Sequence, residues 1–231
     1  MKFNKMIMIA FAAGTLAMGS TGLACDTCGC KAKKASPAKE APAKTAEPMK
    51  ATIGKKAPDF ELVDLDGKKH KLSSYAGKIV VLEWYNPDCP YSGKESGQSV
   101  HKRGTVKRTH DAVAKSDTEV VYLLVNSTSN APKDAVVKRS KESQKQWKLK
   151  SPILIDYGGE VGQMYGARTT PHMYVINGDG VLIYQGAYTD SRRGGEEETN
   201  YVLGAVMSAN KGESCEPAST RPWGCGVKYP R

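Results

Sequence analysis

The stretch Ile79-Val-Val-Leu-Glu-Trp-Tyr-Asn-Pro-Asp-Cys-Pro-Tyr-Ser92 decides the fold of this chain. Its first part is apolar and rich in β-branched and aromatic residues, and Gly77 and Pro87 bound it, so it predicts a strand. Because apolar and polar side chains scarcely alternate, we expect this strand to be buried on both faces, as in a sheet covered by helices.

The thiol of Cys89 comes directly after this strand. Cys89 is followed by Pro90, a residue suited to the first turn of a helix, and residues 92–116 have the pattern of a helix. The sequence therefore predicts a cysteine between the end of a strand and the start of a helix. Backbone N–H groups and the helix dipole would favour the thiolate there, which is the nucleophilic form, whereas the neighbouring Asp88 would oppose it.

Strand and helix patterns alternate along the rest of the chain. An Asp66-Gly67 turn predicts a hairpin within residues 60–72. We expect an α/β fold with a mixed central sheet flanked by helices and an N-terminal hairpin extension. The expected strands are 119–126, 152–156, 168–176 and 181–185, and the expected helices are 132–149, 159–165 and 196–210.

The N-terminal region has the composition of an exported protein. Residues 1–24 combine two lysines, an apolar run and small residues, which is typical of a cleaved signal peptide. We expect a periplasmic or other extracytoplasmic location. Leu23-Ala24-Cys25 also resembles a lipoprotein site, so Cys25 could carry a lipid anchor. Residues 25–58 form a cysteine cluster and a Lys/Ala/Pro linker, too poor in large apolar residues to build a core.

The cysteine cluster Cys25, Cys28 and Cys30 has two interpretations. Its spacing can direct thiolates to one soft metal ion. It is equally compatible with a lipidated or disulfide-bonded terminus in an oxidising compartment, and three cysteines without a histidine are incomplete for structural zinc. We favour the second interpretation and predict neither a resident metal nor a cofactor.

The charge distribution argues against nucleic-acid binding. The net charge is +10, but residues 1–58 contain ten lysines and only three acidic residues, so residues 59–231 are close to neutral. A basic patch on the folded part is therefore not predicted. We expect one domain over residues 59–210, followed by a flexible Gly/Pro/Ser-rich tail, 211–231, that contains Cys215 and Cys225.

These motifs together resemble a known family. The strand, the aromatic pair and Cys-Pro-aromatic-X look like the active-site segment of thioredoxin-fold redox proteins, with Ser92 where a second cysteine would stand. The wider likeness is to the redoxins, the relatives of alkyl hydroperoxide reductase and thiol-specific antioxidant. It extends from about Ile53 to the ending Gly224-Cys225-Gly-Val-Lys228. Peroxiredoxins would carry Thr or Ser at the position of Asn86.

The resemblance implies a site. It places a cis-proline, Pro171, against the reactive Cys89, with Thr170 and His172 beside it and the aromatic residues Trp84 and Tyr91 along the substrate. His172 could tune the thiol or pack elsewhere. Since Ser92 cannot close a local disulfide, Cys225 is expected either to resolve Cys89 or to bond Cys215 as a structural staple.

Three function classes remain open. The first is an exported thiol oxidoreductase, in which Cys89 attacks a peroxide or a substrate disulfide and a tail cysteine or an external thiol reductant resolves it. The second is a thiolate metal carrier that uses the N-terminal cysteine cluster. The third is a non-catalytic interaction domain with the same fold. Cys89 together with Thr170-Pro171 favours the first class.

Overall fold

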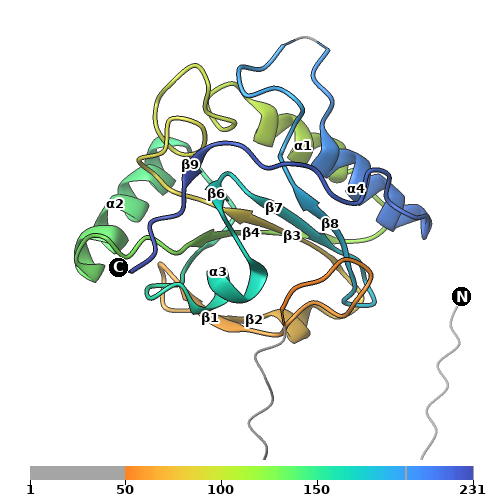
Figure 1. Ribbon diagram of the computed structural model, residues 1–231, viewed down its shortest axis with the longest axis horizontal. Helices are drawn as coiled ribbons and strands as arrows, with labels where there is room; N and C mark the ends of the chain where they lie inside the picture. Colours follow the sequence, from red (N-terminus) through yellow and green to blue (C-terminus); the bar gives the residue numbers. More distant parts are fainter. Residues whose placement is uncertain (1–49, 196, 231) are drawn as a thin grey trace, which may run out of the picture. The chain divides into compact units, whose positions relative to one another are not determined.

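The computed structural model describes residues 50–195 and 197–230 (Figure 1). The four α-helices of this part are α1 (Thr105–Val113), α2 (Lys133–Gln146), α3 (Glu160–Tyr165) and α4 (Tyr201–Lys211), and a short 3₁₀ helix spans Leu72–Tyr75. The strands are β1 (Glu61–Asp64), β2 (Lys69–Lys71), β3 (Ile79–Trp84), β4 (Val120–Asn126), β5 (Ile153–Ile155), β6 (Thr169–Thr170), β7 (Met173–Ile176), β8 (Leu182–Gly186) and β9 (Cys225–Gly226).

Seven strands form one mixed sheet in the order β2-β1-β5-β4-β3-β7-β8. β3 runs parallel to β4 and β4 parallel to β5, whereas the β1–β2, β1–β5, β3–β7 and β7–β8 pairs are antiparallel. The predicted hairpin is therefore present as β1 and β2 at one edge of the sheet. The expected thioredoxin-like α/β architecture with a mixed sheet is confirmed.

β3 is buried on both faces, as its composition predicts. All six of its residues are buried, and its five apolar residues divide between two apolar clusters. Ile79 and Val81 face the cluster that α1 and α4 cover, while Val80 and Leu82 face the cluster that α3 and the hairpin cover. In Figure 1 α1 and α4 lie above β3 and β7, and α3 lies below these strands. The strand that carries Cys89 at its end is thus fixed from both sides.

The helix expected over residues 92–116 is mostly absent. Residues 87–104 form turns, and α1 begins only at Thr105. Gly93 explains part of this, because a Cβ there would lie 2.6 Å from the Pro87 Cα and 2.7 Å from the Asn86 carbonyl oxygen. Gly104, which precedes the helix, has the left-handed φ of 78°. Backbone approach and turn formation therefore override the helical pattern in this segment.

The C-terminal segment also differs from the expectation. α4 begins at Tyr201 rather than near residue 196, because the Asn200 side chain accepts a hydrogen bond from the Leu203 N–H and caps the helix. The tail is packed against the domain: Cys215 and Trp223 are buried in the α1/α4-side cluster. In Figure 1 the tail crosses above β7 and β8 and reaches β6. The flexible tail predicted from composition is wrong.

The signal peptide, the cysteine cluster and most of the linker lie outside the described residues. Within residues 50–195 and 197–230, none of the helices has the length and apolar composition needed to span a bilayer.

Candidate thiol redox site

Cys89 lies in a tight turn at the end of β3. Its N–H donates to the Asn86 carbonyl, and its own carbonyl accepts from the N–H groups of Ser92 and Lys94. Because α1 begins sixteen residues later in the chain, at Thr105, the expected placement of Cys89 at a helix start is wrong, and so is the dipole argument built on it. The side chain is only 2 % exposed, and its Sγ donates to the Thr170 carbonyl oxygen at 2.9 Å.

The Thr170–Pro171 peptide bond is cis, as the resemblance implies. β6, which ends at this bond, pairs antiparallel with β9 in a second, two-stranded sheet. In this register Thr170 faces Cys225 and Thr169 faces Gly226. The residue whose carbonyl binds the Cys89 thiol is therefore the one that pairs with the tail cysteine.

Cys225 lies next to Cys89: both line one cleft, and Cys225 pairs with Thr170, whose carbonyl accepts from the Cys89 Sγ. Burial and the interaction with the neighbouring Cys89 raise the pKa of Cys225 to about 11. Cys225 is only half-buried, whereas Cys89 is buried, and both are free thiols. Cys215 is also free, and burial raises its pKa. It belongs to the apolar cluster on the α1/α4 side, and its Sγ donates a hydrogen bond to the Pro217 carbonyl. The structure thus brings Cys225 to Cys89 and leaves Cys215 in the core.

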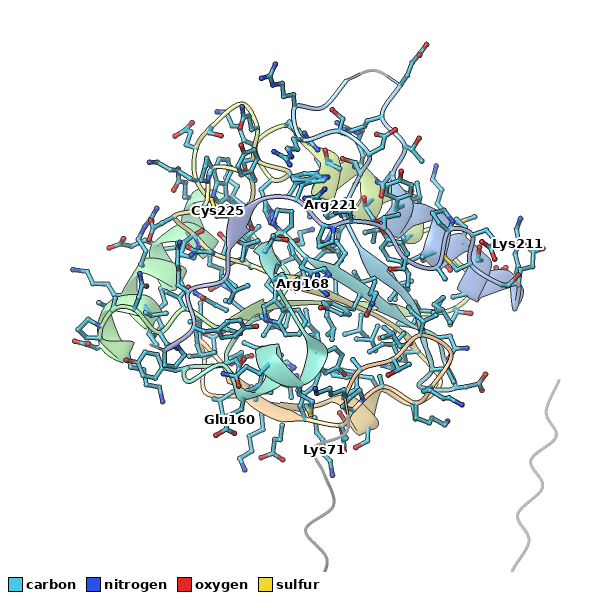
Figure 2. The ribbon with its side chains drawn as sticks, viewed as in Figure 1. Lys71, Glu160, Arg168, Lys211, Arg221 and Cys225 are labelled. Carbon is cyan, nitrogen blue, oxygen red and sulfur yellow. The ribbon has the colours of Figure 1, made fainter. Side chains whose placement is uncertain are left out.

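Gly224 makes this approach possible. A Cβ at this position would lie 2.8 Å from the Thr170 carbonyl carbon and 3.3 Å from the Pro171 Cδ, and its φ of 132° disfavours any other residue. The tail backbone therefore passes against the cis-proline loop where only a glycine fits. Figure 2 shows Cys225 on the tail strand above the sheet.

A cleft of about 320 Å³ lies beside the two thiols. The turn Asn86–Cys89, the end of β4, the start of α2 and Cys225 line it. Asp88, on its rim, is exposed, and its Oδ1 accepts from the Arg139 Nε at 2.8 Å. The guanidinium offsets the acidic charge that the sequence places next to Cys89. Lys228, from the tail, adds a second cation to the cleft.

Three other predicted site residues make their hydrogen bonds and packing contacts with residues other than the two thiols. Trp84 is fully buried and donates its Nε1–H to the Ser127 Oγ at 3.0 Å, so it is a core residue. Tyr91 is half-buried and packs edge-to-face on Trp223 of the tail. His172 is buried and packs on Tyr174, and its pKa falls to about 3 because of desolvation and the charge of Arg168.

The sequence reasoning missed a buried carboxylate on β3. Glu83 is fully buried; its Oε1 accepts from Ser92 at 3.3 Å and lies 3.1 Å from the His101 Nε2, and its Oε2 accepts from the Tyr122 hydroxyl at 2.6 Å. It therefore lies beneath the position where a local second cysteine would stand. A single acidic residue inside an otherwise apolar strand is the signal that could have identified it.

No group of three or more His, Cys, Asp and Glu side chains in residues 50–195 and 197–230 has the arrangement of a metal site. Cys25, Cys28 and Cys30 lie outside the described residues, so the metal interpretation stays a prediction.

The fold is shared with several solved structures. A hypothetical protein from Sinorhizobium meliloti 1021 matches with a TM-score of 0.65 and 22% identity, covering 78% of this chain and 95% of that one. An uncharacterized conserved protein from Geobacillus kaustophilus matches with a TM-score of 0.66 and 22% identity, covering 78% of this chain and 93% of that one.

The sequence also has characterised relatives. It is 32% identical over 136 residues to the thiol-disulfide oxidoreductase ResA of Bacillus thuringiensis subsp. konkukian, which covers 59% of this chain and 70% of that protein. It is 28% identical over 134 residues to the ResA of Geobacillus thermodenitrificans, covering 58% and 68%. The model of the AhpC/TSA family matches residues 53–185. This thioredoxin-fold chain, whose Cys89 turn lies against a cis-proline, therefore belongs to the AhpC/TSA family.

Proposed function

We propose that this protein is an exported thiol-disulfide oxidoreductase whose redox pair is Cys89 and Cys225. The observation that carries the proposal is the β6–β9 pairing, which sets the tail cysteine opposite Thr170, whose carbonyl accepts from Cys89; Ser92 stands where a local second cysteine would be. The similarity to the ResA oxidoreductases supports disulfide exchange as the reaction class.

The exchange proceeds in two steps. The Cys89 thiolate attacks one sulfur of a substrate disulfide, which forms a mixed disulfide and releases one substrate thiolate. The Cys225 thiolate then attacks the Cys89 Sγ, forms the Cys89–Cys225 disulfide and releases the second substrate thiolate. Two electrons pass from the protein to the substrate, and an external thiol reductant restores both thiols. The reverse sequence oxidises a substrate dithiol.

The environment of Cys225 suits the second step. While Cys89 is a free thiolate, its charge and hydrogen bond help to keep Cys225 protonated. Once Cys89 is part of a mixed disulfide, that charge is gone and the Cys225 S–H loses its thiolate acceptor, so the pKa of Cys225 falls and a larger thiolate fraction is available for attack. The resolving thiol is thus held inactive until there is a bond for it to attack.

Disulfide exchange is favoured over peroxide reduction. The peroxide interpretation would place a hydroxyl side chain at position 86, whereas Asn86 uses its Oδ1 to accept from the Asp88 N–H and shape the turn. The ResA relatives are named for thiol-disulfide exchange, which is the activity that we infer for this chain.

The proposal of export is based on the signal-peptide pattern of residues 1–24. In one form of this proposal the exported protein carries a lipid anchor at Cys25. The intact mass of the mature protein tests both: a chain that begins at Met1 would contradict export, and an added diacylglycerol mass would identify the anchor.

The test of the redox pair uses the full chain with single cysteine substitutions. Oxidised protein is expected to yield a Cys89–Cys225 peptide pair by mass spectrometry. With a peptide disulfide as substrate and dithiothreitol as reductant, Cys225→Ser should accumulate a mixed disulfide at Cys89 and lose most turnover, and Cys89→Ser should lose all of it.

Cys215→Ser is the matched control, because it removes a tail thiol that lies in the core instead of at the site. It should leave turnover unchanged. A Cys215–Cys225 disulfide with free Cys89 would identify the tail as a structural staple. Wild-type protein without any turnover would support the non-catalytic interaction domain.

A further inference from the structure

A second cleft, of about 520 Å³, is lined by His172, the residue that follows the cis-proline Pro171. It is formed by the end of α3, the segment around β6, β8 and the tail. Its residues are mainly polar or cationic and include Arg168, His172, Gln185, Ser219 and Arg221. None of the residues that line the thiol cleft lines this one, so it is a separate site. Figure 2 labels both arginines.

His172 gives this cleft a fixed hydrogen-bond donor. The backbone N–H of Arg168 lies 3.2 Å from the His172 Nδ1, and an N–H can only donate, so Nδ1 carries no proton. The pKa of His172, lowered to about 3 mainly by burial, keeps the ring neutral at physiological pH. The ring proton is therefore on Nε2.

The Nε2–H has no acceptor in the part of the chain that the structure describes. The hydrogen bonds of His172, to the Arg168 N–H and to Tyr174, both use Nδ1. The residue as a whole is 4 % exposed and lines the cleft, but Nε2 itself is not among the buried unpartnered atoms, so this N–H is accessible. It is therefore a fixed donor that an acceptor bound in the cleft can use.

The charges around this donor are all of one sign. Arg168 and Arg221 are both exposed, and no carboxylate of residues 50–195 or 197–230 lies within salt-bridge distance of either guanidinium. The cleft has no acidic side chain in its lining. Two arginines alone would be a solvated surface, but two arginines beside a fixed N–H that has no acceptor among the described residues form a site that selects an oxyanion.

We propose that this cleft binds a small molecule through a carboxylate or phosphate group, with Arg168 and Arg221 as charged donors and the His172 Nε2–H as a fixed neutral donor. The volume exceeds what one oxyanion needs, so the ligand has a further polar part that Gln185 and Ser219 can contact. This binding requires no redox step and is independent of the proposed thiol chemistry.

The experiment titrates full-length reduced protein with inorganic phosphate and, separately, with succinate at low ionic strength. Binding is followed by calorimetry and by the ¹⁵N-detected NMR signals of the histidine rings. We expect saturable binding of at least one probe with a shift of the His172 signals. Arg168→Gln and Arg221→Gln should each weaken it about tenfold, the loss expected for one charge-assisted contact.

Arg193→Gln is the matched control, since it removes the same charge from an exposed loop outside the cleft. It should leave the affinity unchanged. Equal weakening by Arg193→Gln would show general charge attraction and overturn the proposal, as would the absence of saturable binding by both probes. The probe that binds more tightly identifies the oxyanion as carboxylate or phosphate. A Cys89→Ser protein should bind equally well, which separates this result from the redox test.

Discussion

At the scale of single residues, the site depends on a glycine as much as on its cysteines. Gly224 allows the tail backbone to lie against the Thr170 carbonyl, and no side chain fits in that space. Two residues further on, Gly226 also belongs to β9, but a Cβ there would meet no atom closer than 3.9 Å. The two positions therefore form a natural pair for mutation.

We expect Gly224→Ala to destabilise the reduced protein by about 1–3 kcal/mol and to separate β9 from β6. Gly226→Ala should stay within about 0.5 kcal/mol of the wild type. Urea unfolding in reductant measures both. The yield of the Cys89–Cys225 disulfide under mild oxidation should fall only in Gly224→Ala, and an unchanged yield there would show that the close approach is dispensable.

The second residue-scale prediction concerns the protonation of Cys225. Three effects raise its pKa to about 11, of which burial is the largest and the other two come from Cys89, while the charge of Lys228 lowers it. Replacing Cys89 by Ser removes the thiolate charge and leaves burial, so the pKa of Cys225 should fall but stay above its usual value. The pH dependence of iodoacetamide labelling at Cys225, with peptide mass spectrometry as readout, checks this in proteins that carry Cys215→Ser. A midpoint that does not move would show that the thiols do not interact.

At the scale of elements, the tail is held by one large anchor. Trp223 is 6 % exposed; its Nε1 donates to the Thr189 carbonyl at 2.7 Å, its ring packs on Tyr91, and the Arg103 guanidinium lies over it at 5.6 Å from the ring centroid. It stands directly before Gly224. The position of Cys225 is therefore set by the burial of its near neighbour.

Trp223→Ala should cost about 3–5 kcal/mol and release the tail from the domain, whereas Trp223→Phe keeps most of the apolar contact and loses chiefly the Nε1 hydrogen bond. Because the tail shields Cys89, we expect alkylation of Cys89 under native, reducing conditions to be markedly faster in Trp223→Ala than in Trp223→Phe. Equal rates in the wild type and both variants would mean that the tail does not control access.

The elements also show where prediction from sequence succeeds. The apolar runs of β3 and its neighbours fit only the interior of a sheet covered on both faces, so these strands could be predicted. The cis configuration of Pro171 was expected from the family resemblance. The prediction of a helix over 92–116 was wrong because Gly93 packs closely against the backbone of Asn86 and Pro87. This tertiary constraint is not contained in any local sequence pattern. The prediction of a flexible tail was wrong for a related reason. The composition of the tail indicates flexibility, but Trp223 and Cys215 pack into a core that is formed by residues far away in the sequence.

At the scale of the whole molecule, the proposed disulfide joins the end of a central strand to the C-terminal tail. The closed loop, 89–225, includes most of the domain. In the chain-entropy description, closing a loop of this length removes on the order of 5 kcal/mol of freedom from the unfolded chain. Cys89 and Cys225 already lie next to each other when reduced, so little native rearrangement should offset this gain.

We therefore expect oxidation to raise the free energy of unfolding by several kcal/mol, up to about 5. Guanidinium unfolding with and without reductant measures the difference. Oxidation should not stabilise the Cys225→Ser protein, whereas it should stabilise the Cys215→Ser protein as much as the wild type. An oxidised protein no more stable than the reduced one would indicate that the bridge forms elsewhere or distorts the site.

The proposed Cys89–Cys225 disulfide also has a topological consequence. When it forms, the backbone from 89 to 225 becomes a covalent ring, which includes β4 to β8 and the four α-helices of the described residues. A protease that cuts one loop of this ring, such as the exposed segment around Arg192 and Arg193, would leave a nicked protein whose pieces stay joined. The same cut in the reduced protein would produce two separable fragments. The redox state of one thiol pair would then decide whether a single cleavage leaves one covalently joined protein or two separate fragments.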